Sequence, residues 1–200
     1  MIELPRRSRS YFLASTAVLS ALAIIAEIIP SFRVFWGMKI DFVGVVWVLA
    51  FFLYGTAEAL YVSIIATIFI LGYSPTTFVG ATMKFIATVP MFLVPGVLLR
   101  LPLSSEKSSN VFNRVLVMST TGFLAILVRV IACSIANYYW AIPLFLGMPS
   151  DVVLQTRFGN SIWVFVVFVA SMNVLQGVID ILAPWFLAFR LGLREHFGTW

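Results

Sequence analysis

Charge, cysteine and histidine are scarce in this sequence of 200 residues. Charged residues make up 10% of it, Cys133 is the one cysteine and His196 the one histidine. A soluble domain usually carries about 25% charged residues. The single cysteine excludes an internal disulfide and a cysteine-cluster metal site. The single histidine excludes an HExxH zinc protease motif, and it stands in a polar tail where it cannot serve an intramembrane serine protease.

Motifs for chemistry on nucleotides or esters are also missing. The sequence has no GxxxxGK[ST] phosphate loop and no GxSxG nucleophile elbow. No Lys/Arg-rich segment interleaved with aromatics indicates a nucleic-acid partner. We therefore expect neither an enzyme nor a cofactor, and the remaining class is a protein that binds or transports a small molecule.

Hydrophobic residues are abundant, at 62%, and they form long runs. A membrane span needs about 20 apolar residues. The first run follows three arginines and continues to about Ile29, which is too long for a typical signal-peptide core. The sequence predicts a single all-α membrane-embedded domain over 1–200, with six transmembrane helices at about 11–29, 42–54, 57–71, 78–99, 111–142 and 162–189. The second and third are short and separated by Gly55-Thr56, so they form either two helices or one kinked unit.

Basic residues predict the orientation of these helices. An even number of spans places both termini on one side. On that side we count eight Lys and Arg against three on the other: Arg6, Arg7, Arg9, Arg100, Lys107, Arg114, Arg190 and Arg194 against Arg33, Lys39 and Arg157. Cytoplasmic loops carry such an excess. The bias predicts cytoplasmic termini, and the basic helix ends would meet lipid headgroups.

Four polar residues within the predicted spans fall at one depth. Glu27, Lys84, Arg129 and Asn173 each lie 15 to 18 positions from the predicted cytoplasmic end of their helix. At about 1.5 Å per residue they form one layer in the outer half of the membrane. Intramembrane charges usually face a bundle interior and pair with one another. Glu27 would neutralise Lys84 or Arg129 and leave one cation over.

More polar and aromatic residues extend this layer towards the outer surface. Gln176 shares a helical face with Asn173, and Asn137 lies two turns beyond Arg129. Four aromatic residues surround that end, namely Tyr138, Tyr139, Trp140 and Trp163. The pattern predicts a polar pocket with an aromatic rim that opens outward. Asp180 lies deeper, one turn below Gln176, and has no assigned role.

Simpler interpretations exist for each feature. Tyr and Trp at helix ends are often interfacial belt residues. An Arg–Glu pair within a membrane can serve only to hold helices together. Lys84 stands about two turns from the outer surface, where its ammonium can extend to the headgroups instead of the pocket.

Three segments resemble a known family. GMKIDFVGVVWVLAFFLYGTAEAL at 37–60 resembles the loop and second helix of the substrate-binding S components of energy-coupling factor (ECF) vitamin transporters. NYYWAIPLF at 137–145 and MNVLQGVIDIL at 172–182 resemble the fifth and sixth helices of the riboflavin-binding branch. By this resemblance Asn137 and Asn173 match ligand positions, and Lys39 and Asp41 match the start of the loop.

The resemblance implies a function and partners. An S component of the riboflavin branch captures riboflavin outside a prokaryotic plasma membrane and delivers it inward. It docks on a membrane T component driven by two cytoplasmic ATPases, which would explain the missing phosphate loop. Docking in the family uses an Ala-x-x-x-Ala face on the first helix, which Ala17 and Ala21 match, with Ala14 nearby. Ordinary packing within the chain is the alternative for these alanines.

Two departures from the riboflavin branch leave the identity of the ligand undecided. Gln176 stands where the branch has Lys, and Lys84 stands near an Asn of its fourth helix. One interpretation is that a cation has moved from the sixth helix to the fourth within a riboflavin site. The other is that Lys84 binds an anionic vitamin such as folate, biotin or pantothenate. The second cation, Arg129, favours this other interpretation. A non-transport structural or assembly protein with a lipid-filled pocket is a further alternative.

Overall fold

The computed structural model describes residues 8–29, 32–33, 38–73, 77–101 and 108–200. Its helical elements, in chain order, are α1 (Arg9–Ile28), α2 (Val43–Tyr54), α3 (Thr56–Tyr73), α4 (Thr77–Arg100), η1 (Ser109–Asn113), α5 (Val115–Ala136), η2 (Asn137–Ala141), α6 (Ile142–Leu146), α7 (Ser150–Arg157), α8 (Ile162–Trp185), η3 (Phe186–Arg190) and α9 (Leu193–Phe197). Two short strands, β1 (Phe32–Arg33) and β2 (Lys39–Ile40), pair antiparallel between α1 and α2. The prediction of a helical bundle is confirmed.

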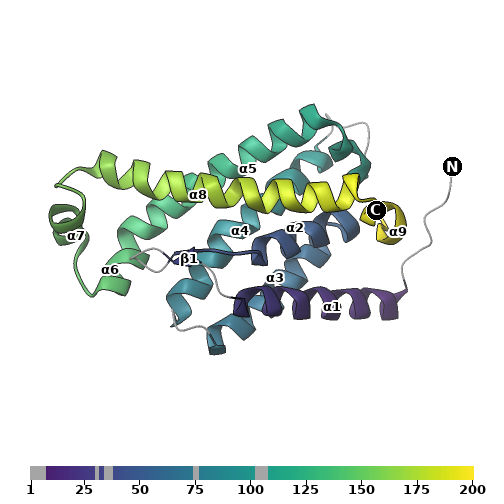
Figure 1. The fold of residues 1–200 in the computed structure, drawn as a ribbon, viewed down its shortest axis with the longest axis horizontal. Helices are drawn as coiled ribbons and strands as arrows, with labels where there is room; N and C mark the ends of the chain where they lie inside the picture. The colour runs from purple at the N-terminus through teal and green to yellow at the C-terminus, as the bar shows by residue number, and fades with distance from the viewer. Residues whose placement is uncertain (1–7, 30–31, 34–37, 74–76, 102–107) are drawn as a thin grey trace.

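Four of the six predicted spans have the length and apolar character needed to cross a membrane. They are Arg9–Ile28, Phe78–Arg100, Val115–Leu146 and Ile162–Arg190. The other two are shorter apolar helices, α2 and α3. Figure 1 shows that α1 begins at the end of the bundle where the C-terminus lies. That this end faces the cytoplasm stays a prediction.

Helix α2 is the centre of the bundle. Eleven of its 12 residues are buried, and it packs against α1, α3, α4 and α8. A helix that is apolar all round is buried on every side. At about 1.5 Å per residue it is only about 18 Å long, less than the bilayer core of about 30 Å. Space therefore remains beyond its first residue, where the β1–β2 pair lies (Figure 1).

The break at Gly55 makes α2 and α3 two separate helices. Gly55 has φ of +98°, a region that glycine enters at little cost. Its N–H donates to the Phe51 carbonyl, which ends α2, and α3 starts at the next residue. The alternative of one kinked helix is therefore wrong.

The predicted end of the fifth span before Pro143 is wrong. The helix continues from α5 through η2 and α6 to Leu146. Within η2 the chain makes one wider turn, in which the Ile142 N–H bonds to the Asn137 carbonyl five residues earlier. Pro143 then occupies the first turn of α6, where a missing N–H costs little. Gly147, with φ of +65°, ends the helix instead.

The C-terminal segment fastens the end of α2. The Trp200 indole N–H donates to the Phe51 carbonyl at 2.8 Å, and the Thr199 N–H donates to the Leu53 carbonyl at 2.9 Å. The Phe51 carbonyl also accepts the Gly55 N–H, so the indole adds a second bond to it. The Leu53 carbonyl is one of the last in α2, which lack partners within the helix. Arg194 of α9 and Ser109 of η1 both donate to the Trp200 carbonyl. The segment thus ties α2 to η1 at the end of the bundle near the start of α1 (Figure 1).

Replacing Trp200 should destabilise the bundle. Trp200→Phe should cost about 1 kcal/mol because it removes the hydrogen bond to Phe51 but keeps the ring. Trp200→Ala should cost about 2 kcal/mol or more because the aromatic contact with Phe51 is lost as well. Thermal unfolding in mild detergent measures both. Trp163→Ala is the control, since that side chain is 75% exposed. Equal midpoints for Trp163→Ala and Trp200→Ala would contradict the role given to this segment.

Candidate functional site

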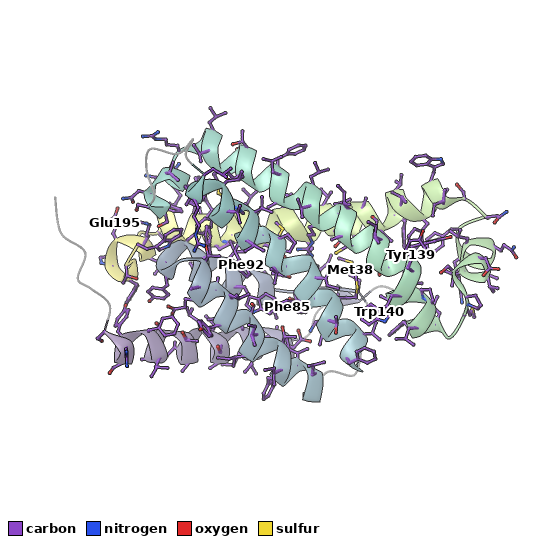
Figure 2. All side chains as sticks on the ribbon, turned by 180° about the vertical axis from the view of Figure 1, so that it is seen from behind. Met38, Phe85, Phe92, Tyr139, Trp140 and Glu195 are labelled. Atoms are coloured by element: carbon purple, nitrogen blue, oxygen red, sulfur yellow. The ribbon has the colours of Figure 1, made fainter. Side chains whose placement is uncertain are left out.

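A cavity of about 830 Å³, including its opening, lies between the start of α2 and the surrounding helices. Its walls come from α1, the β2 region, α2 to α6, and α8. All eight residues predicted to form the binding site line it: Glu27, Lys39, Asp41, Lys84, Arg129, Asn137, Asn173 and Gln176. Met38 is one of the residues that line the cavity. Figure 2 shows it on the side of the bundle where Tyr139 and Trp140 lie, far from Glu195 of α9. The cavity is therefore displaced from the C-terminal end of the bundle.

The first part of the site is an ion-pair cluster around Lys84. The Lys84 ammonium lies 2.7 Å from Glu27 Oε2 and also contacts Asp41 Oδ2. Lys39 lies 2.5 Å from Glu27 Oε1 and donates to the Glu27 carbonyl at 3.0 Å. The predicted Lys84–Glu27 pair is thus present. The alternative that Lys84 extends to the surface is wrong, because its side chain is 13% exposed and points at two carboxylates.

Burial changes the acidity of the loop lysine. Desolvation lowers the pKa of the Lys39 ammonium below its ordinary value, and the charge of Lys84 acts in the same direction. The carboxylates of Glu27 and Asp41 oppose this change. The two ammonium groups of Lys39 and Lys84 repel each other, and the carboxylates of Glu27 and Asp41 compensate this repulsion.

The second part of the site is a buried pair between α5 and α8. Arg129 donates through Nη1 to Asp180 Oδ2 at 2.7 Å and through Nε to Asn173 Oδ1 at 3.2 Å. Of the two alternatives for Glu27, the pair with Lys84 is present and the pair with Arg129 is not. Asp180 is a residue of the cavity wall that sequence reasoning left without a role. Gly44 of α2 makes room for it, because a Cβ there would overlap the Asp180 carboxylate.

Gln176 joins the two parts. Its Nε2 donates to Asp180 Oδ1 at 2.7 Å and to the Asp41 carbonyl at 2.8 Å, while its Oε1 accepts from the Asp41 N–H at 3.2 Å. Asp41 in turn accepts the Val43 N–H at 2.9 Å, in the first turn of α2. One amide thus fixes the loop before α2 against α8 and sets the distance between the two clusters.

In the described part of the cavity wall the charges balance. Lys39, Lys84 and Arg129 are the cations, and Glu27, Asp41 and Asp180 are the anions. Each cation contacts at least one of the three carboxylates. The expectation of a surplus cation is therefore wrong within the described residues, because the charges of the predicted layer were Glu27, Lys84 and Arg129 alone. The cavity wall adds Lys39, Asp41 and Asp180 to them.

The expected aromatic rim is also corrected. Tyr138, Tyr139, Trp140 and Trp163 are absent from the described cavity wall, where the aromatic side chain is Phe145. Tyr139 and Trp163 are each 75% exposed, which favours the alternative of interfacial belt residues. Apolar side chains complete the wall instead, among them Met38, Ile70, Val79, Met83 and Ala87.

Asn137 enters the wall through the wider turn of η2. Its side-chain N–H donates to the Cys133 carbonyl at 2.8 Å, four residues earlier. Such wide turns in helices are frequent at functional sites. Asn137 is buried and lies beside Cys133 in the cavity wall, so its amide oxygen is held in a fixed position there.

The predicted docking residues lie outside the cavity. Ala14, Ala17 and Ala21 are all exposed, on the face of α1 opposite its buried residues. The alternative that they pack within the chain is therefore wrong. Their contact with another protein stays a prediction.

Comparison with known proteins identifies the fold. No protein-family profile and no curated protein sequence matches the chain. A solved structure of the S component of a bacterial ECF transporter matches with a TM-score of 0.69 and 22% sequence identity. The match covers 92% of this chain and 97% of that one. The chain therefore has the S-component fold.

Removing Lys84 should destabilise the protein through the carboxylates that it leaves behind. We expect Lys84→Met to cost about 3–5 kcal/mol, as for other broken buried pairs. Adding Asp41→Asn should recover more stability than adding Glu27→Gln, because Glu27 keeps Lys39 as a partner. Thermal unfolding of the single and double variants measures the coupling. Arg100→Met, at the exposed end of the same helix, is the control. Additive effects of Lys84→Met and Asp41→Asn would refute the pairing.

Proposed function

We propose that this protein is the substrate-binding S component of an ECF-type importer in a prokaryotic plasma membrane. The observation that carries the proposal is a cavity lined by convergent amide and charged groups, set in an S-component fold. Ligand sites are typically concave, mostly apolar and provided with a few placed polar groups. Partner chains would supply ATP hydrolysis, since the chain has no phosphate loop.

We propose riboflavin as the ligand. Riboflavin is uncharged and has a flat ring with a polar edge. The balanced charges of the wall suit an uncharged ligand, and Asn137 and Asn173 offer amide groups to the polar edge. The apolar side chains of Met38, Ile70 and Met83 offer surfaces on which a flat ring can pack.

The alternative ligands are less well supported. Folate, biotin and pantothenate carry carboxylates, and each cation in the wall already contacts a carboxylate of the protein. Binding such a vitamin would leave one buried anion without a full partner, which is costly. A lipid chain, as a structural or assembly protein would hold, fits poorly against six charged side chains.

We further propose that the alanine face of α1 docks on a T component, which is driven by two cytoplasmic ATPases. Ala14, Ala17 and Ala21 present small side chains to the surroundings of the bundle. Small residues let two membrane helices approach closely. The face is separate from the cavity wall, so binding and docking can be tested independently.

Riboflavin binding is the direct test of the ligand. Protein purified in mild detergent should quench flavin fluorescence at one site per chain, and excess biotin, folate or pantothenate should not compete. Asn137→Leu should weaken binding about tenfold, the loss expected for one hydrogen bond of roughly 1.4 kcal/mol. Asn113→Leu, exposed in η1, is the control and should bind normally. Absence of quenching, or displacement by a carboxylate vitamin, would reject riboflavin.

Docking is tested by a bulky substitution on α1. Ala17→Trp should leave riboflavin affinity unchanged but reduce uptake by cells about tenfold or more, because close helix approach is blocked. Leu116→Trp is the matched control, since Leu116 is 77% exposed on α5, away from α1. Uptake and the amount of co-purified complex are measured together. Normal assembly with lost riboflavin binding in Ala17→Trp would refute the assignment.

A further inference from the structure

Asp180 is the charged residue of the cavity wall that sequence reasoning left without a role. It is 1% exposed, and its partner Arg129 is 2% exposed. Both side chains line the cavity. A charge buried in an apolar bundle interacts strongly with any other charge brought nearby, because little water screens it. The state of this pair therefore affects which ligands the cavity accepts.

We propose that Asp180 determines the charge class of the ligand: by neutralising Arg129, it makes the cavity select uncharged molecules and reject anions. The inference rests on the proposed function, because it assumes that the cavity is the ligand site. It goes further by assigning the selection against anions to one carboxylate.

The pairing pattern distinguishes Asp180 from the other two carboxylates. Glu27 and Asp41 share Lys84, and Glu27 also holds Lys39, so removing either one leaves a carboxylate on Lys84. Arg129 contacts one carboxylate among the described residues, that of Asp180. Loss of any of the three carboxylates adds one positive charge to the wall, but loss of the Asp180 charge leaves Arg129 with no carboxylate contact among the described residues, so that its guanidinium is available to a ligand anion.

An asparagine at this position keeps the shape of the site. Asp180 Oδ1 accepts from Gln176 and Oδ2 from Arg129. The asparagine oxygen can still accept from Gln176, whereas its NH₂ group would face the Arg129 donors. Arg129 keeps its bond to Asn173 and so stays in place. Asp180→Asn thus changes the charge of the wall with little change in its volume, which Gly44 already accommodates.

The experiment compares two flavins that differ in charge. Riboflavin and riboflavin 5′-phosphate share the ring, and the phosphate adds roughly −1.5 to −2 charges at pH 7. Dissociation constants for both are measured with the wild-type protein, Asp180→Asn and the double variant Asp180→Asn/Arg129→Gln. We expect Asp180→Asn to shift the affinity ratio towards the phosphate by about tenfold or more, as one charge-assisted contact would. The double variant, with both charges removed, should return to the wild-type preference.

A purely structural role predicts a different result. Damage to the fold would weaken both flavins alike and leave their affinity ratio unchanged, and that outcome overturns the inference while the proposed function stands. Asp151→Asn, which removes an exposed carboxylate on α7, is the control and should leave the ratio unchanged. Wild-type protein that binds neither flavin overturns both the inference and the riboflavin assignment.

A reciprocal variant keeps the test decisive if Asp180→Asn does not fold. Arg129→Gln leaves the Asp180 carboxyl group without its cation, and an ammonium group on the ligand would restore the ion pair. It should shift preference towards a riboflavin analogue with an ammonium group in place of the 5′-hydroxyl, again by about tenfold. An unchanged ratio between this analogue and riboflavin overturns the inference.

Discussion

Pairing of buried charge is the constraint on which the rest of the structure depends. Among the described residues, six charged side chains face one cavity inside an apolar bundle, and each contacts an opposite charge. An unpaired charge in such surroundings is costly. Meeting this requirement fixes α1, α4, α5 and α8, and the loop before α2, relative to one another. Gln176 adds the neutral link between the Lys84 and Arg129 clusters.

The short central helix makes that arrangement possible. If α2 spanned the full bilayer, its side chains would fill the space that the loop and the cavity occupy. Its fully buried aromatic side chains, Trp47, Phe51 and Phe52, instead pack at the levels below the cavity. At the far end the Thr199 N–H satisfies the Leu53 carbonyl, and the Trp200 indole adds a second bond to the Phe51 carbonyl. The bundle is thus packed and closed at the end where the C-terminus lies, and hollow towards the other.

Much of this was predictable from sequence, and the errors have physical causes. Long apolar runs predicted the helices, and counting positions along them placed Lys84 level with Glu27. The same counting separated Arg129 from Asp180. Side chains on a helix lean towards its N-terminus, and α5 and α8 run in opposite directions (Figure 1). Arg129 and Asp180 therefore lean towards each other, and backbone depth underestimates their proximity.

Other features depend on tertiary context that no single segment carries. Pro143 was expected to end a helix, but the helix continues through the wide turn at Asn137. The Tyr138 carbonyl, five residues before Pro143, accepts from the Ser150 hydroxyl instead. Tyr139 and Trp163 were expected at the rim because they are near it in sequence, yet their side chains face outward. Which side of a helix faces the cavity depends on its neighbours. The apolar runs alone leave that choice open.

An experimental structure with riboflavin bound is the most direct measurement of the central claim. The account predicts one flavin within the cavity, its polar edge towards Asn137 and Asn173, with the Lys84 and Arg129 ion pairs intact around it. A cavity filled by lipid, or a flavin whose binding requires Arg129 to leave Asp180, would contradict the account of a charge-balanced site for an uncharged ligand.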